Sequence, residues 1–113
     1  MKPHPLTLEH LRTLSRRPGM FMHDFDLRDL ELQLYGFEAG LDAAGVLDDS
    51  DRFNRAFSDF LTSTIGLSCS LGWAEALLRE YGQSEATFNK FLIFVKEATF
   101  ERSPSWQRDS GDT

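Results

Sequence analysis

The chain has 113 residues, of which 41% are hydrophobic and 27% are charged. A chain of this length folds as one domain, so we expect no second folded domain. The composition is typical of a soluble globular protein, and no apolar run reaches the roughly 18 residues that a transmembrane helix needs. The N-terminus lacks the apolar segment of a signal peptide, so we expect a cytoplasmic protein without membrane contact.

The net charge of -6 is concentrated in the middle of the chain. Residues 24–59 contain ten acidic and three basic side chains, whereas residues 1–23 contain four bases and one acid. An acidic surface repels a phosphate backbone and attracts a basic partner, so the charge argues against nucleic-acid binding. Acidic surfaces also serve solubility, and this alternative stays open.

The first predicted helix has Thr7 as its N-cap and leucines at every third position from Leu8, and Pro18-Gly19 ends it. We expect Met20 and Phe21, which follow this stop, to anchor the turn on the core. The second helix spans roughly residues 27–44, with Asp26 as N-cap and Gly45 as the C′ glycine.

The second helix has three distinct faces at 100° per residue. Its core stripe consists of Leu27, Leu30, Leu34, Phe37 and Leu41. A small, mostly apolar face lies nearly opposite and contains Leu32, Gly36, Ala39 and Ala43, with Gly40 beside them. Glycines destabilise a helix interior by about 1 kcal/mol each, so this face predicts close approach of another backbone, from a second helix or a twin subunit. Between the two faces runs an acidic stripe of Glu31, Tyr35, Glu38 and Asp42.

Three further helices are predicted in the second half of the chain. The third follows an acid-rich turn at residues 47–50 that supplies its N-cap, and it carries a phenylalanine stripe that we expect in the core. The fourth runs from Trp73 to Tyr81, with Tyr81 packing inward and Gly82 ending it. The fifth starts after Ser84 and is apolar around most of its circumference, which predicts extensive burial. Its run FLIFV also fits a buried strand, although length favours a helix.

These elements predict an all-α domain of about five helices over residues 1–102, followed by a flexible polar tail at residues 103–113. Chemistry-bearing motifs are missing from the sequence. The three histidines all lie within the first 23 residues, phosphate-binding glycine loops do not occur, and no metal-ligand spacing is present. We therefore expect neither a cofactor nor a metal, and no catalytic residues, although an enzyme stays an open option.

An ordered series of motifs carries a family resemblance. The series is Arg-Arg-Pro-Gly-Met-Phe at 16–21, Leu-Tyr-Gly-Phe-Glu-Ala at 34–39, Phe57-x-x-Phe60, Gly72-Trp73-Ala74 and Phe88-x-x-Phe91. It resembles small bacterial helical proteins of RPGM[YF] type over roughly residues 8–95, with Phe21 where tyrosine is commoner. Such proteins are associated with polymorphic toxin and effector loci, and the resemblance implies a role in immunity.

We therefore predict an immunity protein that binds a cognate toxin, of the basic kind that acts on nucleic acids, and blocks its active site or substrate path. The predicted contact is the acidic stripe with the acids at the helix ends: Asp24, Asp26, Glu31, Tyr35, Glu38, Asp42, Asp48 and Asp49. The alternative is a homodimeric helical scaffold or regulator that associates through Leu32, Gly36, Ala39 and Ala43.

Overall fold

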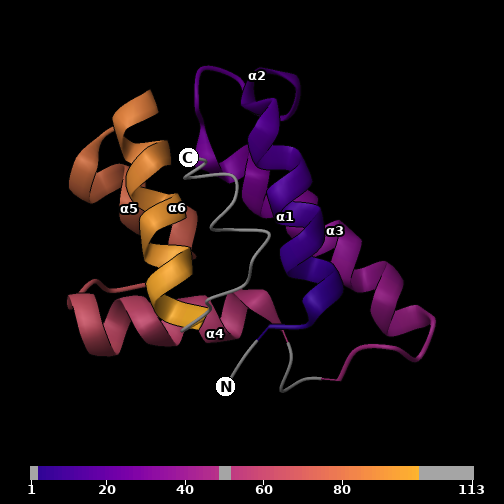
Figure 1. The fold of residues 1–113 in the computed structure, drawn as a ribbon. Helices are drawn as coiled ribbons and strands as arrows, with labels where there is room; N and C mark the ends of the chain where they lie inside the picture. Colours follow the sequence, from indigo (N-terminus) through magenta and orange to yellow (C-terminus); the bar gives the residue numbers. More distant parts are fainter. Residues whose placement is uncertain (1–2, 49–51, 100–113) are drawn as a thin grey trace.

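The computed structural model describes residues 3–48 and 52–99. In chain order the elements are α1 (Pro5–Arg16), α2 (Pro18–Phe21), α3 (Leu27–Ala43), α4 (Phe53–Phe60), the π-helical turn η2 (Leu61–Ile65), α5 (Trp73–Tyr81) and α6 (Glu85–Thr99) (Figure 1). No strand occurs in these two ranges, and the prediction of an all-α fold is confirmed. The predicted boundary between residues 102 and 103, and the tail beyond it, lie outside the described residues.

Helix α3 packs against α1, α2 and α5. In Figure 1, α5 and α6 form the left half of the molecule, α1 and α3 form the right half, and α4 crosses beneath. Helix α4 packs against both α5 and α6. This arrangement directs the N-termini of α4 and α5 toward α3.

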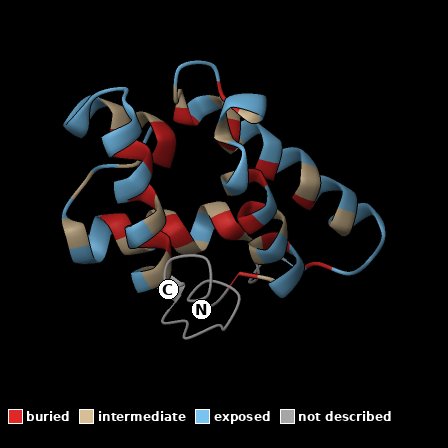
Figure 2. Cartoon of the chain, turned by 45° about the horizontal axis from the view of Figure 1, so that its top comes forward, coloured by how far each residue is buried: buried red, intermediate tan, exposed pale blue. Residues whose placement is uncertain are grey.

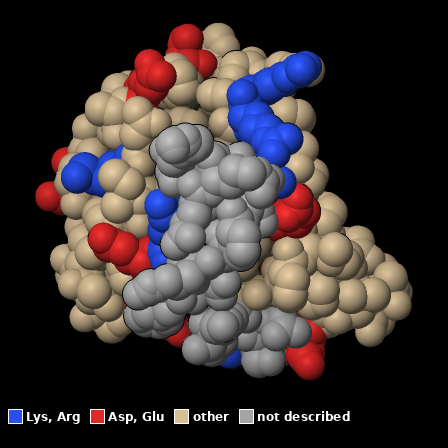
Figure 3. Space-filling view, in the orientation of Figure 1, with Lys and Arg blue, Asp and Glu red and all other residues tan. Residues whose placement is uncertain are grey.

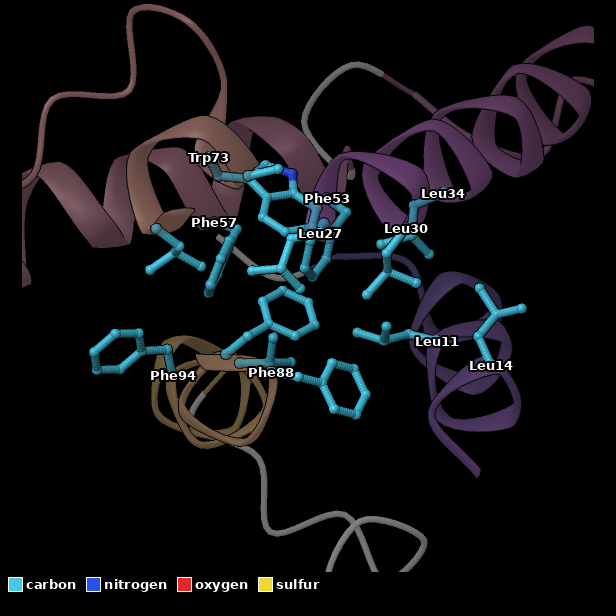
Figure 4. Packing of buried hydrophobic residues seen from close by; sticks show 14 of the residues in the cluster. Leu11, Leu14, Leu27, Leu30, Leu34, Phe53, Phe57, Trp73, Phe88 and Phe94 are labelled. Carbon is cyan, nitrogen blue, oxygen red and sulfur yellow. The ribbon is translucent and has the colours of Figure 1, made fainter. Parts of the chain in front are cut away.

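The core consists of side chains from α1, α3, α4, α5 and α6 that point to a common centre (Figure 4). The core contains an aromatic cluster in which Trp73 stacks on Phe91 with ring centroids 4.9 Å apart. The ring of Phe57 is T-shaped to both of these rings, and its centroid lies 5.4 Å from each of theirs. The indole Nε1 of Trp73 donates a hydrogen bond to Asn54 Oδ1 at 2.7 Å, which satisfies the buried polar group. The predicted core role of the phenylalanine stripe is confirmed for Phe53 and Phe57.

Several predicted boundaries are confirmed because local interactions fix them. Asp26 caps α3, where its carboxylate accepts the N–H of Arg28, and Gly45 follows the helix with φ +76°. Helix α5 runs from Trp73 to Tyr81 and ends at Gly82. At the start of α6, Ser84 Oγ accepts the N–H of Thr87 at 3.3 Å.

Predictions around the first helix are wrong in detail. Helix α1 begins at Pro5 with His4 as the N-cap, not Thr7, because the His4 side chain accepts the N–H of Leu6 and Pro5 suits the first helical position. Thr7 lies inside the helix, and its hydroxyl bonds to Glu38. Pro18 does not only stop α1 but also starts the short helix α2, in which its fixed φ suits the first position. Met20 is 67% exposed and anchors nothing, whereas Phe21 packs against the core.

The second half of the chain also departs from prediction at three points. The N-cap of α4 is Arg52, which makes no side-chain capping hydrogen bond. On α6, Ile93 points to solvent, so this helix is less enclosed than its composition predicts, and the partly exposed Tyr81 closes α5 at the surface.

None of the helices in the described part of the chain is both long and apolar enough to cross a membrane.

Candidate protein-binding surface

The four side chains of the predicted acidic stripe on α3 have different environments. Glu38 is only 3% exposed and lies in the core, whereas Glu31 is half-buried and Tyr35 and Asp42 are exposed. At 100° per residue, Glu31 and Glu38 lie at the edge of the leucine stripe, so a neighbouring helix can cover them. The prediction of one exposed acidic stripe is therefore wrong.

Glu38 joins three helices through one carboxylate. Its two oxygens accept the backbone N–H of Phe53 at 3.1 and 3.0 Å, and Oε2 also accepts the hydroxyl of Thr7 at 2.8 Å. Phe53 is the first residue of α4, whose own N-cap offers no side-chain acceptor. A carboxylate there satisfies a free N–H and faces the positive end of the helix dipole. Glu38 is thus a tertiary cap of α4 and is not accessible to a partner.

Glu31 has the same role at the N-terminus of α5. Its carboxylate accepts the backbone N–H groups of Trp73 and Ala74, and burial raises its pKa above the ordinary value, with a smaller contribution from the charge of Glu75. The N-cap residue of α5, Gly72, has φ +100° and no side chain with which to cap the helix. Glu31 and Glu38, which were predicted to contact a partner, therefore cap two helices of the same chain.

The remaining predicted contact residues are scattered. Asp42 is exposed and its Oδ2 pairs with Arg52 at 2.7 Å. Asp26 is the N-cap of α3, and its hydrogen bonds with the Arg28 side chain lower the pKa of its carboxyl group. Asp24 and Asp48 are exposed at opposite ends of α3, and Asp49 lies outside the described residues. Acidic and basic side chains are interspersed on the face that Figure 3 shows.

An exposed apolar surface occupies the other side of α3. We call it the α3 outer face; Leu32 and Tyr35 are its largest members, 69% and 61% exposed. In Figure 2, most of α3 beyond its midpoint is exposed, and the lobe around it in Figure 3 is mostly free of charged side chains. The full set, all exposed, is Leu32, Tyr35, Gly36, Ala39, Gly40 and Ala43.

The two glycines of the α3 outer face meet no close neighbour among residues 3–48 and 52–99. A β-carbon built on Gly36 or Gly40 would meet nothing within 4 Å, and neither residue has a positive φ. Glycine inside a helix destabilises it by about 1 kcal/mol relative to alanine. Packing within the described part of the chain thus does not require glycine at either position.

A hollow of about 360 Å³ lies between α1 and α3, next to Gly36. The imidazole of His10 stacks on the ring of Phe37 with centroids 4.1 Å apart and planes 11° from parallel. Leu32, Gln33 and Gly36 complete the lining. Sequence reasoning did not single out His10, Gln33 or Phe37 as surface residues, because only the packing of α1 on α3 brings the ring pair together.

A tight turn at residues 23–26 links α2 to α3. The N–H of Asp26 bonds to the carbonyl of His23 at 2.9 Å across Asp24 and Phe25, whose φ angles are +52° and +59°. This is the geometry of a type I′ turn, in which a bulky residue such as Phe25 is strained. Two contacts hold it: the Phe25 ring lies 5.8 Å from that of Phe88, and Gln83 Nε2 donates to the carbonyl of Asp24 at 3.0 Å.

Two observations concern metal binding and the cysteine thiol. No cluster of three or more His, Cys, Asp or Glu residues that could hold a metal ion occurs there. Burial raises the pKa of the Cys69 thiol, which disfavours the nucleophilic thiolate.

Comparison with known proteins yields no relative: no family model, no curated protein and no solved structure matches this chain.

Proposed function

We propose that this chain is a non-enzymatic immunity protein that binds a cognate bacterial toxin in the cytoplasm and blocks its active site or substrate path. The motif resemblance supports the class of function. The observation that carries the proposal is the α3 outer face, an exposed apolar surface on a rigid helix whose inner side is fixed by the Glu31 and Glu38 caps. Exposed aromatic and aliphatic side chains on a rigid element are typical of binding hot spots.

The acidic charge supports a basic protein partner and argues against nucleic acid. With a net charge of -6, the chain attracts a basic toxin at long range, which raises the association rate. Because Glu31 and Glu38 face inward, the stripe does not supply this attraction at close range. We therefore assign the close contact to the apolar residues around Tyr35, with Asp42 at their edge.

The test is co-expression with the toxin encoded by the neighbouring gene. Tyr35→Lys and Ala39→Lys place a charge on the α3 outer face, where neither side chain has a hydrogen bond to lose, and we expect both variants to fold and to lose protection. Asn89→Lys, on the exposed side of α6, is the matched control and should protect fully. Full protection by both α3 variants would overturn the assignment of this face. A neighbouring gene whose product does not bind the wild-type chain would overturn the function.

A homodimeric scaffold is the second candidate, and the unused glycines favour it. If two α3 helices pack antiparallel with Gly36 facing its twin, Leu32 of one copy lies opposite Gly40 of the other, and the symmetry repeats this contact. The large exposed side chain then fits over a position that has no side chain. Because Gly40 has no side chain, the two helix backbones can approach closely at this contact.

Analytical ultracentrifugation over a range of protein concentrations tests the dimer. Gly40→Leu has room within its own chain and should leave the monomer folded while preventing association. Gly82→Leu is not a suitable control because Gly82 has a positive φ, so Asn89→Leu on α6 is used instead. A wild-type chain that stays monomeric at all concentrations would exclude this candidate and leave toxin binding as the function of the face.

A further inference from the structure

The turn at residues 23–26 has two consecutive residues in the left-handed region. The φ angles are +52° at Asp24 and +59° at Phe25, and no other non-glycine residue within residues 3–48 and 52–99 has a positive φ. Aspartate occurs in this region more often than most residues, whereas a bulky side chain such as that of Phe25 is strained there. Such strain persists only where surrounding contacts impose it, and it is common in switch regions.

The hydrogen bonds within the turn do not select its hand. The N–H of Asp26 donates to the carbonyl of His23 at 2.9 Å, a bond that type I and type I′ turns share. The N–H of His23 donates to Asp29 Oδ2 at 2.8 Å and fixes the residue before the strained pair. A type I turn, with negative φ at both central residues, would keep the bond between Asp26 and His23. The local sequence therefore permits a second, unstrained form of the turn.

Two contacts from the α5–α6 region impose the left-handed form. Gln83 Nε2, in the loop between α5 and α6, donates to the carbonyl oxygen of Asp24 at 3.0 Å. The ring of Phe25 packs against that of Phe88 on α6, with centroids 5.8 Å apart. The Gln83 bond is exposed, so water can replace it, and Phe25 is only half-buried. Neither contact uses the backbone hydrogen bonds of a helix, so both can be released without unfolding one.

We propose that the 23–26 turn is a two-state switch. In its closed form Gln83 holds the left-handed turn and Phe25 packs on Phe88, which is 4% exposed. In its released form the turn is type I and Phe25 leaves Phe88. Release also remodels the hollow of about 290 Å³ lined by residues 18–19 and 22–25, because Asp24 and Phe25 form part of its wall. The α5–α6 loop thus controls the surface beside the Arg-Pro-Gly-Met motif, independently of the proposed function.

Relaxation-dispersion NMR of the full chain tests the switch, because it detects minor forms that exchange in microseconds to milliseconds. We expect exchange at the amides of residues 24–26 and 83 in the wild type. Gln83→Ala should raise the population of the released form about fivefold, the equivalent of one neutral hydrogen bond. Amide–Hα couplings, which report φ, detect the same change if exchange is faster. Gln33→Ala, at an exposed glutamine of α3 outside this turn, is the matched control and should behave as the wild type.

A rescue variant separates strain from simple loss of a hydrogen bond. Glycine adopts positive φ about as readily as negative φ, so Asp24→Gly in the Gln83→Ala background should return the released population to near the wild-type level. The Asp24 side chain is exposed, and its pairing with His23 lies at the surface. Three outcomes would overturn the switch. These are no exchange and no change of couplings in either the wild type or Gln83→Ala, a released population that Gln83→Ala leaves unchanged, and a failure of Asp24→Gly to restore it.

Discussion

The carboxylate of Glu31 on α3 lies so close to Gly72 that a β-carbon at residue 72 would come within 2.8 Å of Glu31 Oε2. The same carboxylate accepts the N–H groups of Trp73 and Ala74, so the missing side chain at Gly72 admits the group that caps α5. The Gly-Trp pair of the sequence is thus explained by packing: glycine admits the cap and Trp73 fills the core.

Gly72→Ala should lower the free energy of unfolding by about 1–3 kcal/mol through backbone strain, and by more if Glu31 is displaced from its cap. Gly82→Ala is the matched control, since Gly82 also has a positive φ but nothing lies within 4 Å of the added carbon. Urea unfolding measures both variants. A smaller loss for Gly72→Ala than for Gly82→Ala would contradict the role of Glu31.

Gly36→Ala should have the opposite effect and stabilise the chain by about 0.5–1 kcal/mol, because alanine is the better helix former and the position is open. Thermal unfolding of the variant and of Gly40→Ala provides the measurement. A loss of stability in dilute monomer would show that Gly36 has a packing role within the chain.

Glu38→Ala should destabilise the fold by about 2–4 kcal/mol, because the N–H of Phe53 and the hydroxyl of Thr7 lose their acceptor in the core. Asp42→Asn on the same helix removes an exposed ion pair and should change stability by less than about 1 kcal/mol. Chemical denaturation distinguishes the two. Equal effects would mean that Glu38 is not the cap of α4. Because Glu31 and Glu38 cap α5 and α4, a charge reversal at these two positions would disrupt the fold, so such variants do not test toxin binding.

The stability contribution of Glu31 should depend on pH with a defined sign. Since burial raises its folded-state pKa, the folded chain holds this proton more tightly than the unfolded chain does. The contribution is therefore complete below the unfolded pKa of about 4.3 and is lost as pH rises through the folded pKa. Unfolding curves at several acidic pH values should show wild type losing stability relative to Glu31→Gln as pH rises. A constant difference, or the reverse trend, would contradict a desolvated Glu31.

Phe57→Ala should cost about 3–5 kcal/mol, the usual effect of removing a buried phenylalanine. Phe57 is fully enclosed and its ring contacts Phe53, Trp73 and Phe91. The melting temperature measured by circular dichroism at the helix bands reports the loss. An unchanged melting temperature would place this ring at the surface.

The sequence by itself determined the helices whose ends depend on local contacts. The start of α3 after Asp26, its end before Gly45, both limits of α5 and the start of α6 follow from capping residues and apolar spacing within one segment. The core positions of Leu27, Leu30 and Leu34 on α3, and of Phe53 and Phe57 on α4, follow from the same helical period. Phe37 and Leu41, which the period also assigns to the core stripe, are only half-buried and lie outside the core cluster. These interactions span few residues, so a linear pattern contains them.

Only the tertiary structure decided what the α3 side chains outside the leucine stripe do. Helical spacing places Glu31 and Glu38 at the edge of the core face, but it does not show that α5 and α4 begin there and present free N–H groups to them. Thr7 and His10 likewise acquire their roles through residues 31 and 27 positions away, Glu38 and Phe37. From its residue type, a carboxylate is predicted to be exposed. It is buried only where another helix supplies hydrogen-bond donors that replace water.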